Sequence, residues 1–280
     1  MAVLVASFLV TIIITPRFIE KLRKAGIVGQ DVHKEKKVQV PEMGGLTILF
    51  GVSAGMFISI PFVSADLVYL FAAFLTVLLA GVMGVCDDLF GIRFRTKSLL
   101  PLFAAVPLMV VQAGVHTMNI PFWGAVNFGV LYPLVLIPVA ITVVANSSNM
   151  LAGYNGLEAG MGAIACFFMG LAGLILGKIE VAILTFSMFG ACLAFLKYNR
   201  YPSRVFIGDV GTFSIGAGIA AAAIIGNMEI IGIVVIAPYI LNGLITSLEI
   251  VRRKPVQRFS KVKQGILVPP GPRYTQTLYF

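Results

Sequence analysis

Charged residues are scarce in this sequence, and their scarcity excludes a soluble globular domain. Only 12% of the 280 residues are Asp, Glu, Lys or Arg, whereas about 25% is usual in soluble domains. Hydrophobic residues make up 59%, and the mean hydropathy is +0.97. A helix that spans a bilayer needs roughly 20 apolar residues, and runs of this kind fill most of the chain. The composition therefore predicts an all-α polytopic membrane protein.

Cysteine and an N-terminal basic segment are also lacking. The three cysteines, Cys86, Cys166 and Cys192, are too few for a disulfide framework, and none has zinc-type spacing with histidine. We therefore expect them to be packing residues. The first apolar run precedes its basic residues instead of following them. This order favours a retained first helix over a cleaved signal peptide.

Nine apolar runs predict nine transmembrane helices. The run at 212–226 consists almost entirely of small residues, which is typical of close helix–helix packing in membranes. No internal repeat divides the chain, so we expect a single transmembrane domain over 1–250, followed by a basic cytoplasmic loop or tail over 251–280. The runs lie at 2–16, 44–63, 67–86, 98–115, 128–145, 159–177, 180–196, 212–226 and 229–250.

Basic residues predict the orientation of these helices, because short loops rich in Lys and Arg stay on the cytoplasmic side. If the segments after odd-numbered helices are cytoplasmic, they hold 20 of the 21 Lys and Arg residues, and only Lys178 lies outside. Nine acids then lie inside and three outside, so the two faces carry about +11 and −2. The sequence predicts an N-terminus outside and polar loops that face the cytoplasm.

Ionisable residues are missing from the middle of every run, which disfavours an ion-coupled transporter because such proteins usually need acids or bases within the membrane. The layout instead suits chemistry between a soluble anionic substrate and a lipid head group. A small-molecule membrane transporter and a membrane assembly scaffold are the alternative classes, and neither gives the clustered acids an evident use. The acids at the predicted cytoplasmic boundary are Asp87, Asp88, Glu158, Asp209 and Glu249.

Two adjacent carboxylates, Asp87 and Asp88, follow the third apolar run, and three basic residues ending at Lys97 come soon after. A carboxylate pair beside cations at the mouth of a membrane helix suits a divalent metal and a phosphorylated substrate. The alternative is that helix ends carry charge simply because charge is costly inside the bilayer.

Amides and glycines mark two further loops. The loop 146–160 carries Asn146, Asn149 and Asn155 and no cation, and amides can bind a hard metal or read the edge of a base. A plain Asn-Gly turn is the alternative, although it does not explain three asparagines. The PEMGG turn at 41–45 has paired glycines, which let a backbone approach a ligand closely.

The last two polar segments lie late in the chain. Asp209 follows Gly208 at the start of a helix; it is either an N-cap or, with Asp87, Asp88 and Asn149, an oxygen ligand for Mg²⁺. Phe206 is either a stacking or a packing aromatic. The basic cluster Arg252, Arg253 and Lys254 suits a diphosphate, but a basic cytoplasmic tail is the alternative.

Together the motifs PEMGG, DDLFGIRFRTK, NMLAGYNGLEAG and RVFIGDVGT resemble the polyprenyl-phosphate N-acetylhexosamine-1-phosphate transferase family. NMLAGYNGLEAG and VFIGD are similar to the dolichyl-phosphate GlcNAc-1-phosphate transferase branch. The resemblance implies Mg²⁺-dependent transfer of N-acetylhexosamine-1-phosphate, with GlcNAc-1-phosphate expected, from a UDP-sugar to a polyprenyl or dolichyl phosphate, with release of UMP.

The resemblance also implies roles for individual residues of a catalytic domain over 1–250. Asp87 and Asp88 would engage or activate the lipid phosphate, with Lys97 assisting phosphate binding. Asn149 and Asp209 would hold Mg²⁺, with Mn²⁺ as an alternative ion. The implied substrate-binding residues are Glu42, Gly153, Asn155, Phe206, Arg252, Arg253 and Lys254.

Three departures from the family pattern stand out. The position three residues after the second carboxylate, where the family often has Asn or Asp, is Gly91 here, so a ligand role there is lost. Family members have a tenth helix, and this sequence stops at Phe280 where one would begin; we expect either a truncated sequence or a chain without that helix. The His-rich last loop of the bacterial enzymes is replaced by the Arg/Lys cluster.

The partners that the resemblance implies are a UDP-sugar, a polyprenyl or dolichyl phosphate lipid and the membrane itself. A homodimer is compatible with it, and no nucleic-acid partner is expected. The expected location is the plasma membrane of a prokaryote or the endoplasmic reticulum membrane, with the active site facing the cytoplasm.

Overall fold

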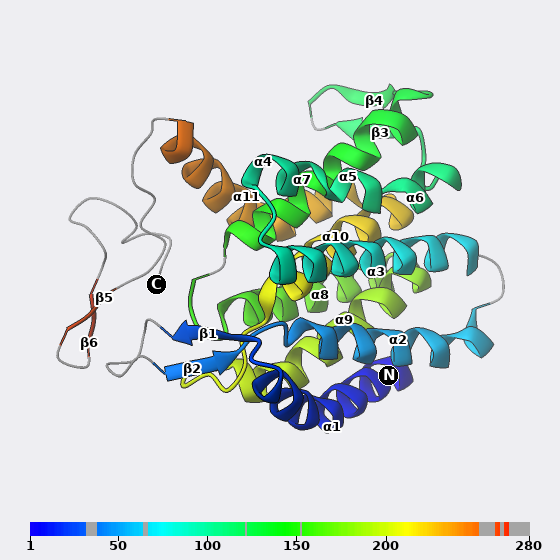
Figure 1. The fold of residues 1–280 in the computed structure, drawn as a ribbon. Helices are drawn as coiled ribbons and strands as arrows, with labels where there is room; N and C mark the ends of the chain where they lie inside the picture. Colours follow the sequence, from blue (N-terminus) through cyan, green and yellow to red (C-terminus); the bar gives the residue numbers. More distant parts are fainter. Residues whose placement is uncertain are drawn as a thin grey trace.

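Long helices lie side by side in the computed structural model, which describes residues 1–31, 38–63, 67–120, 122–151, 153–251, 261–263 and 266–268 (Figure 1). Apolar sequence over three to six turns favours this arrangement, because each helix satisfies its own backbone hydrogen bonds. The long helices are α1 (Ala2–Lys24), α2 (Gly45–Ser59), α3 (Leu67–Phe90), α7 (Ile137–Met150), α8 (Leu157–Ile175), α9 (Ile179–Asn199), α10 (Gly208–Gly226) and α11 (Glu229–Val251).

Short elements join these helices. Three two-stranded antiparallel hairpins, which the sequence analysis does not predict, are β1–β2 (Val28–Asp31 and Val38–Pro41), β3–β4 (Thr117–Ile120 and Gly124–Asn127) and β5–β6 (Lys261–Lys263 and Ile266–Val268). The short helices are η1 (Ile60–Phe62), α4 (Phe94–Leu99), α5 (Pro101–Ala104), α6 (Val106–Val110) and η2 (Tyr132–Leu136). The hairpin β1–β2 lies at one end of the bundle, and β3–β4 lies at the other (Figure 1).

Six helices in the described residues are long and apolar enough to cross a membrane, and the two segments of α11 together would make a seventh. The nine apolar runs therefore do not correspond to nine long helices. The run at 98–115 forms three short helices, because Pro101 and Pro107 each lack the N–H that an unbroken helix would need. The run at 44–63 forms the 15-residue helix α2, followed directly by the three residues of η1, and α2 alone is shorter than a perpendicular span requires.

Helix α11 is bent by 65° between its segments Glu229–Val235 and Ala237–Leu248. Pro238 lies just after the break, where its ring clashes with the carbonyl four residues earlier and removes one hydrogen bond. The bend directs the second segment of α11 across the bundle, and its end lies on the side of the hairpin β1–β2 (Figure 1).

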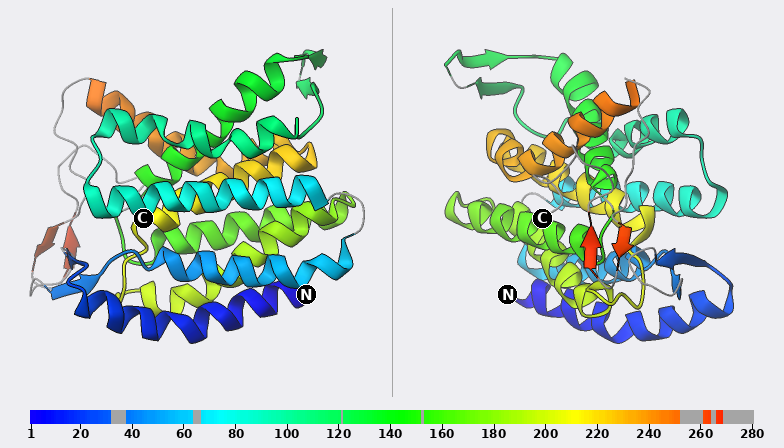
Figure 2. Two further views of the ribbon diagram at one scale, coloured as in Figure 1. Left: turned by 45° about the vertical axis from the view of Figure 1, so that its right-hand side comes forward. Right: turned by 90° about the vertical axis from the view of Figure 1, so that its left-hand side faces the viewer.

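Helix α10 is the centre of the bundle. It packs against α2, α3, α7, α8, α9 and α11, and every residue from Val210 to Gly226 is buried. Helices α1, α2 and α9 lie on one side of it, and α7 and α11 lie on the other (Figure 2). The small-residue composition of 212–226 predicts this close packing, and the structure confirms it.

Glycines bring the backbones of α3 and α10 together. A Cβ atom at Gly84 would lie 2.4 Å from the Cα and N atoms of Val210, closer than any real Cβ contact, so only glycine permits this approach. The contact lies within one turn of the adjacent carboxylates at the end of α3. It therefore fixes how the charged end of α3 faces the start of α10.

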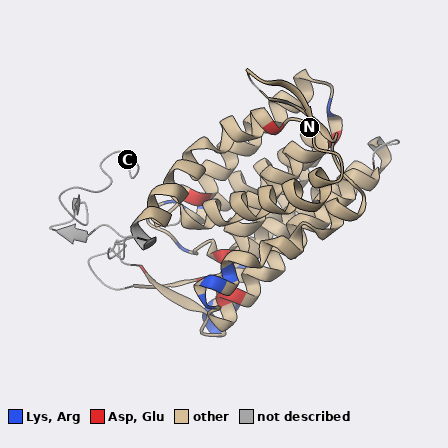
Figure 3. Cartoon of the chain, turned by 90° about the horizontal axis from the view of Figure 1, so that it is seen from above, with Lys and Arg blue, Asp and Glu red and all other residues tan. Residues whose placement is uncertain are grey.

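Charged residues gather toward the two ends of the bundle, with uncharged helices between them (Figure 3). Two of the three cysteines, Cys166 and Cys192, are buried and free, as expected of packing residues. The cytoplasmic assignment of the more basic end stays a prediction.

We predict that Gly84→Ala lowers the thermal unfolding midpoint of the detergent-purified protein. The added Cβ must push α3 away from α10, and overpacking of this kind costs about 1–3 kcal/mol. Gly160→Ala is the matched control, because its Cβ would lie 3.9 Å from the nearest atom, Cδ2 of Leu196. Equal midpoints for the two variants would contradict the close contact between α3 and α10.

Candidate active site

The polar ends of several helices meet at the end of the bundle that carries β1–β2. Helix α3 ends there with its two aspartates, α10 begins there with Asp209, and α7 ends there with Asn149, one residue before its last residue. Helix α4 adds Lys97. Segments up to 122 residues apart in the sequence thus contribute to one site (Figure 1).

Lys97 lies between two carboxylates. Its ammonium forms ion pairs with Oδ2 of Asp87 and Oδ2 of Asp209, and Asp87 Oδ1 also accepts a 2.9 Å hydrogen bond from the backbone N–H of Ile92. Burial alone would lower the pKa of Lys97, but the charges and hydrogen bonds of Asp209 and Asp87 outweigh it and raise this pKa above its ordinary value. The lysine is therefore fully protonated, and a positive charge is held between the two acids.

Asn149 holds the other oxygen of Asp209. Its Nδ2 donates hydrogen bonds of 2.5 Å to Asp209 Oδ1 and 2.9 Å to the hydroxyl of Thr212. Thr212 lies three residues after Asp209, on the same face of α10. The amide and the carboxylate are thus fixed relative to each other by both helices.

The carboxylate of Asp88 satisfies the first N–H groups of α10. Its Oδ1 accepts a 2.9 Å hydrogen bond from the backbone N–H of Asp209, and its Oδ2 accepts one of 3.2 Å from that of Val210. The N-cap of α10 is Ile207, which has no side-chain cap. The alternative in which Asp209 is the N-cap is therefore wrong: a carboxylate from α3 supplies this interaction, which also complements the positive end of the helix dipole.

Gly208 leaves room for the Asp88 carboxylate. Its φ is +70°, and a Cβ atom there would lie 2.6 Å from Asp88 Oδ2 and 3.0 Å from the backbone of Met43. Any larger residue would be strained and would displace the carboxylate. The glycine before Asp209 is thus required by the same contact that orients the start of α10.

The PEMGG turn joins the site through its backbone. The N–H groups of Gly44 and Gly45 donate 2.8 Å hydrogen bonds to the carbonyls of Phe206 and Ile207, and the N–H of Phe206 donates one of 2.8 Å to the carbonyl of Pro41. A Cβ at Gly45 would lie 2.4 Å from Gly211 Cα. The paired glycines therefore allow the backbone of α10 to pack directly against the PEMGG turn.

Glu42 lies beside the acids of the site. Burial raises the pKa of its carboxyl above the usual value, and the negative charge of Asp209 raises it further. Gly29 of β1 packs directly against this side chain, because a Cβ there would overlap Glu42 Oε1. The hairpin thus positions Glu42 toward the site.

The asparagine-rich loop is held by two carboxylates. The N–H of Gly153 donates a 3.1 Å hydrogen bond to Oε1 of Glu158, and Nδ2 of Asn155 donates one of 3.1 Å to Oδ2 of Asp31. Gly156 has a φ of +85° at the start of α8, which favours glycine. The Asn-Gly pair is therefore a turn with a specific side-chain contact.

Most of the residues predicted from the sequence thus belong to connected parts of one end of the molecule. Asp87, Asp88, Lys97, Asn149 and Asp209 are joined directly. Glu42 and Phe206 lie beside them, and Gly153 and Asn155 lie in a loop that is held by Glu158 and Asp31. The predicted Arg252, Arg253 and Lys254 lie outside the described residues. Three described residues that hold the site were not assigned to it from the sequence: Asp31, Glu158 and Thr212. Glu158 is one of the acids at the predicted cytoplasmic boundary, and Thr212 has a spacing of three from Asp209, but Asp31 has no such signal.

The donor set fits a hard divalent cation. Among the described residues no three His, Cys, Asp or Glu side chains form a metal-type cluster, but Asp87 and Asp209 present carboxylates on both sides of one ammonium, and the amide of Asn149 lies next to Asp209 with its NH₂ end facing the carboxylate. Carboxylate and amide oxygens are the ligands that Mg²⁺ prefers. The ammonium of Lys97 marks a position where these groups already stabilise positive charge.

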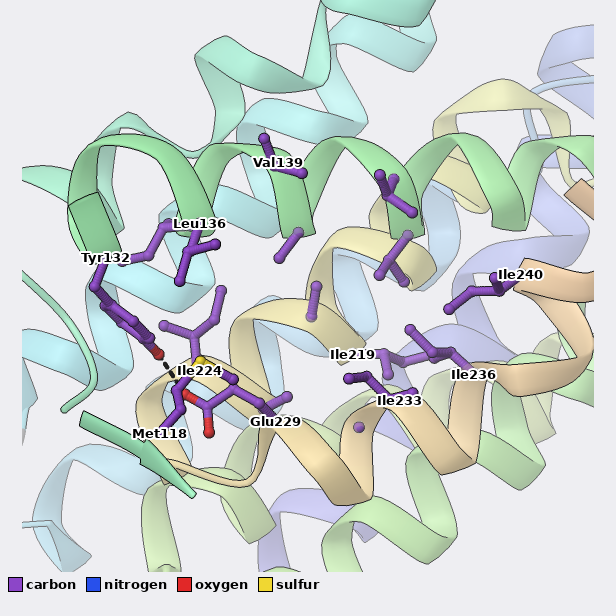
Figure 4. A pocket seen from close by; sticks show the side chains of 17 residues that line it. Met118, Tyr132, Leu136, Val139, Ile219, Ile224, Glu229, Ile233, Ile236 and Ile240 are labelled. Atoms are coloured by element: carbon purple, nitrogen blue, oxygen red, sulfur yellow. Dashed lines mark hydrogen bonds between the residues drawn. The ribbon is translucent and has the colours of Figure 1, made fainter. Parts of the chain in front are cut away.

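An apolar cavity of about 280 Å³ lies between α7, α10 and α11. Figure 4 shows isoleucines of α10 and α11 facing Val139 and Leu136, with the hydrogen-bonded pair Tyr132 and Glu229 at one end. On α7 the lining ends at Val144. Asn149 follows five residues later, about 7.5 Å along the helix. The end of the cavity at Val144 is thus the end nearer to the polar site, and on α10 the lining begins at Ile219, ten residues after Asp209.

In comparisons with known proteins, residues 70–227 match a protein family described as "Glycosyl transferase family 4". A protein of Saccharolobus solfataricus, provisionally named UDP-N-acetylglucosamine–dolichyl-phosphate N-acetylglucosaminephosphotransferase, is 36% identical over 242 residues, which are 85% of this chain and 75% of that protein. The phospho-N-acetylmuramoyl-pentapeptide-transferase of Clostridium perfringens is 32% identical over 268 residues, covering 88% of this chain and 82% of its own. The matched family region contains the acids of α3 and α10.

We predict that Lys97→Met destabilises the protein more at pH 8 than at pH 5. Without the ammonium, the carboxylates of Asp87 and Asp209 repel each other, and protonation of either one relieves the repulsion. The folded variant binds this proton more tightly than the unfolded chain, so its stability falls as the pH rises. In thermal unfolding experiments at pH 8, the free energy of unfolding of Lys97→Met should be about 1–3 kcal/mol lower than that of the wild type.

The matched control for this measurement is Lys197→Met. This variant removes an ammonium that lies 5.8 Å from the ring centre of Tyr198, and it should change stability little at either pH. A deficit for Lys97→Met that does not depend on pH would mean that the two carboxylates do not face each other.

Proposed function

We infer that this chain, which belongs to glycosyl transferase family 4, transfers a sugar-1-phosphate from a nucleotide sugar to a polyprenyl phosphate. The observation that carries the proposal is the convergence of Asp87, Lys97, Asn149 and Asp209 at one polar end of a membrane bundle. A soluble diphosphate and a lipid phosphate can meet there. Both substrates are anionic, so the reaction needs positive charge between them.

The donor that we propose is a UDP-N-acetylhexosamine, with UDP-GlcNAc preferred and UMP released. The relative of Saccharolobus solfataricus named for UDP-N-acetylglucosamine is 36% identical to this chain, compared with 32% for the Clostridium perfringens enzyme named for a muramoyl pentapeptide. We assign uridine binding to Gly153, Asn155 and Phe206. Contacts to the diphosphate and sugar are assigned to Glu42, Arg252, Arg253 and Lys254.

The chain's own residues supply positioning and charge. Lys97 keeps Asp87 and Asp209 together and offers an ammonium to a phosphate oxygen. Asp88 holds the N–H groups that start α10, so it fixes the place of Asp209 and is a positioning residue rather than a free base. Asn149 and Asp209 would hold Mg²⁺, which would supply the charge that neutralises the diphosphate. Holding the two phosphates in line contributes much of the remaining rate enhancement.

The lipid acceptor accounts for the apolar cavity. Its walls from α7, α10 and α11 match an isoprenoid chain, which needs only apolar contact, and α7 itself continues beyond the cavity to Asn149. A polyprenyl or dolichyl chain lying along these helices would place its phosphate at the site. We propose that this end faces the cytoplasm, because the basic loops lie there and such loops stay inside.

We predict that the purified protein releases UMP from UDP-GlcNAc only when Mg²⁺ and a polyprenyl phosphate are both present. The products to measure are UMP and the lipid-linked GlcNAc-1-phosphate. Parallel reactions with the UDP-muramoyl pentapeptide test the sugar assignment. UMP release without the lipid would indicate hydrolysis instead of transfer.

Asp209→Asn should lower this turnover on the order of 100-fold while the protein still folds, because the amide cannot replace the negative charge that holds the cation. Glu180→Gln is the matched control: Glu180 is likewise an acid in the first turn of its helix, α9, but it lies at the opposite end. Full activity of Asp209→Asn would remove Asp209 from the site.

A further inference from the structure

Asp31 is a buried carboxylate to which the proposed reaction gives no role. It is the last residue of β1, and only 1% of it is exposed. Its Oδ2 accepts the 3.1 Å hydrogen bond from Nδ2 of Asn155. The two residues are 124 positions apart in the sequence, so this contact joins the hairpin β1–β2 to the loop that precedes α8.

The same loop is fixed on its other side. Glu158, of which 8% is exposed, accepts the hydrogen bond from the N–H of Gly153. A Cβ atom at Gly156 would lie 3.2 Å from Cα of Arg200, so the turn also packs closely against the end of α9. The backbone around Asn155 is therefore set by α8 and α9, and the orientation of its side-chain amide is set by Asp31.

A carboxylate acts only as an acceptor, so it holds the NH₂ end of the Asn155 amide and directs the carbonyl end away from itself. Without such a partner, an amide can rotate to present either end. Uracil has a donor at N3, whereas cytosine has an acceptor at N3. A carbonyl oxygen fixed opposite this position accepts a hydrogen bond from uracil and faces a lone pair on cytosine.

We propose that Asp31 is a positioning residue that fixes the Asn155 amide and thereby makes the site select a uracil nucleotide over a cytosine nucleotide. This inference rests on the proposed function, in which Asn155 contacts the nucleobase. It extends that function to a residue of the hairpin β1–β2 that has no contact with the phosphates in the proposed reaction.

The test compares the binding of UMP and CMP to the full-length protein by calorimetry, together with steady-state kinetics on UDP-GlcNAc. Wild type should prefer UMP. In Asp31→Leu the affinity for UMP should fall, and the KM for UDP-GlcNAc should rise, on the order of tenfold. The kcat should change little, and the preference for UMP over CMP should shrink toward one. Asp31→Asn retains an acceptor and should be intermediate.

Gln39→Ala is the matched control, because Gln39 is an exposed residue on the partner strand β2 and its loss should leave both affinities unchanged. The double variant Asp31→Asn with Asn155→Asp exchanges donor and acceptor, so it should bind UMP more tightly than Asn155→Asp alone. This recovery distinguishes a specific pair from general damage to the hairpin.

An unchanged ratio of UMP to CMP affinity in Asp31→Leu would overturn the inference, and Asp31→Asn decides the question if the leucine variant does not fold. A wild type that releases UMP from UDP-GlcNAc but shows no preference for UMP over CMP would also overturn it, while leaving the proposed function intact. A wild type that neither binds UMP nor uses UDP-GlcNAc would instead refute the proposed function and the inference together.

Discussion

The hydrogen bonds from the first N–H groups of α10 to the carboxylate of Asp88 are the interaction on which the site depends. The N–H groups at the start of a helix have no partner within that helix and must find acceptors elsewhere, and here the neighbouring helix α3 provides acceptors for two of them. The same contact sets the position of Asp209, and through it the positions of Lys97 and Asn149. The need to pair the N–H groups at the start of α10 therefore determines where the residues proposed to act in the reaction lie.

Small residues make this contact possible. Gly84 lets the backbones of α3 and α10 touch, Gly208 leaves space for the Asp88 carboxylate, and Gly45 lets α2 begin against Gly211. In a membrane, where apolar helices gain little from leaving lipid, close packing of this kind supplies much of the association energy. The geometry of the polar site therefore depends on an apolar core in which glycines allow the helix backbones to come into close contact.

The sequence predicted the helical membrane fold, the small-residue core helix and the residues around Asp87 and Asp209, because hydrophobic runs and isolated acids are local signals. It did not predict that Asp88, and not Asp209, completes the start of α10, since that contact spans 121 residues. Nor did it predict that the run at 98–115 breaks into short helices at Pro101 and Pro107, because the apolar composition of this run is the same as that of a continuous membrane helix. Asp31 gave no signal at all: its burial and its contact with Asn155 exist only in the folded chain.

The central claim is that Asp209 and its neighbours hold a divalent cation against a nucleotide diphosphate. Pulsed electron paramagnetic resonance of Mn²⁺ bound to the purified protein tests it most directly, because ³¹P couplings report phosphate oxygens on the metal. The account predicts tightly bound Mn²⁺ that shows ³¹P coupling when UDP is added, and loss of this bound ion in Asp209→Asn. Mn²⁺ that binds equally well to Asp209→Asn, or that shows no coupling to UDP, would contradict it.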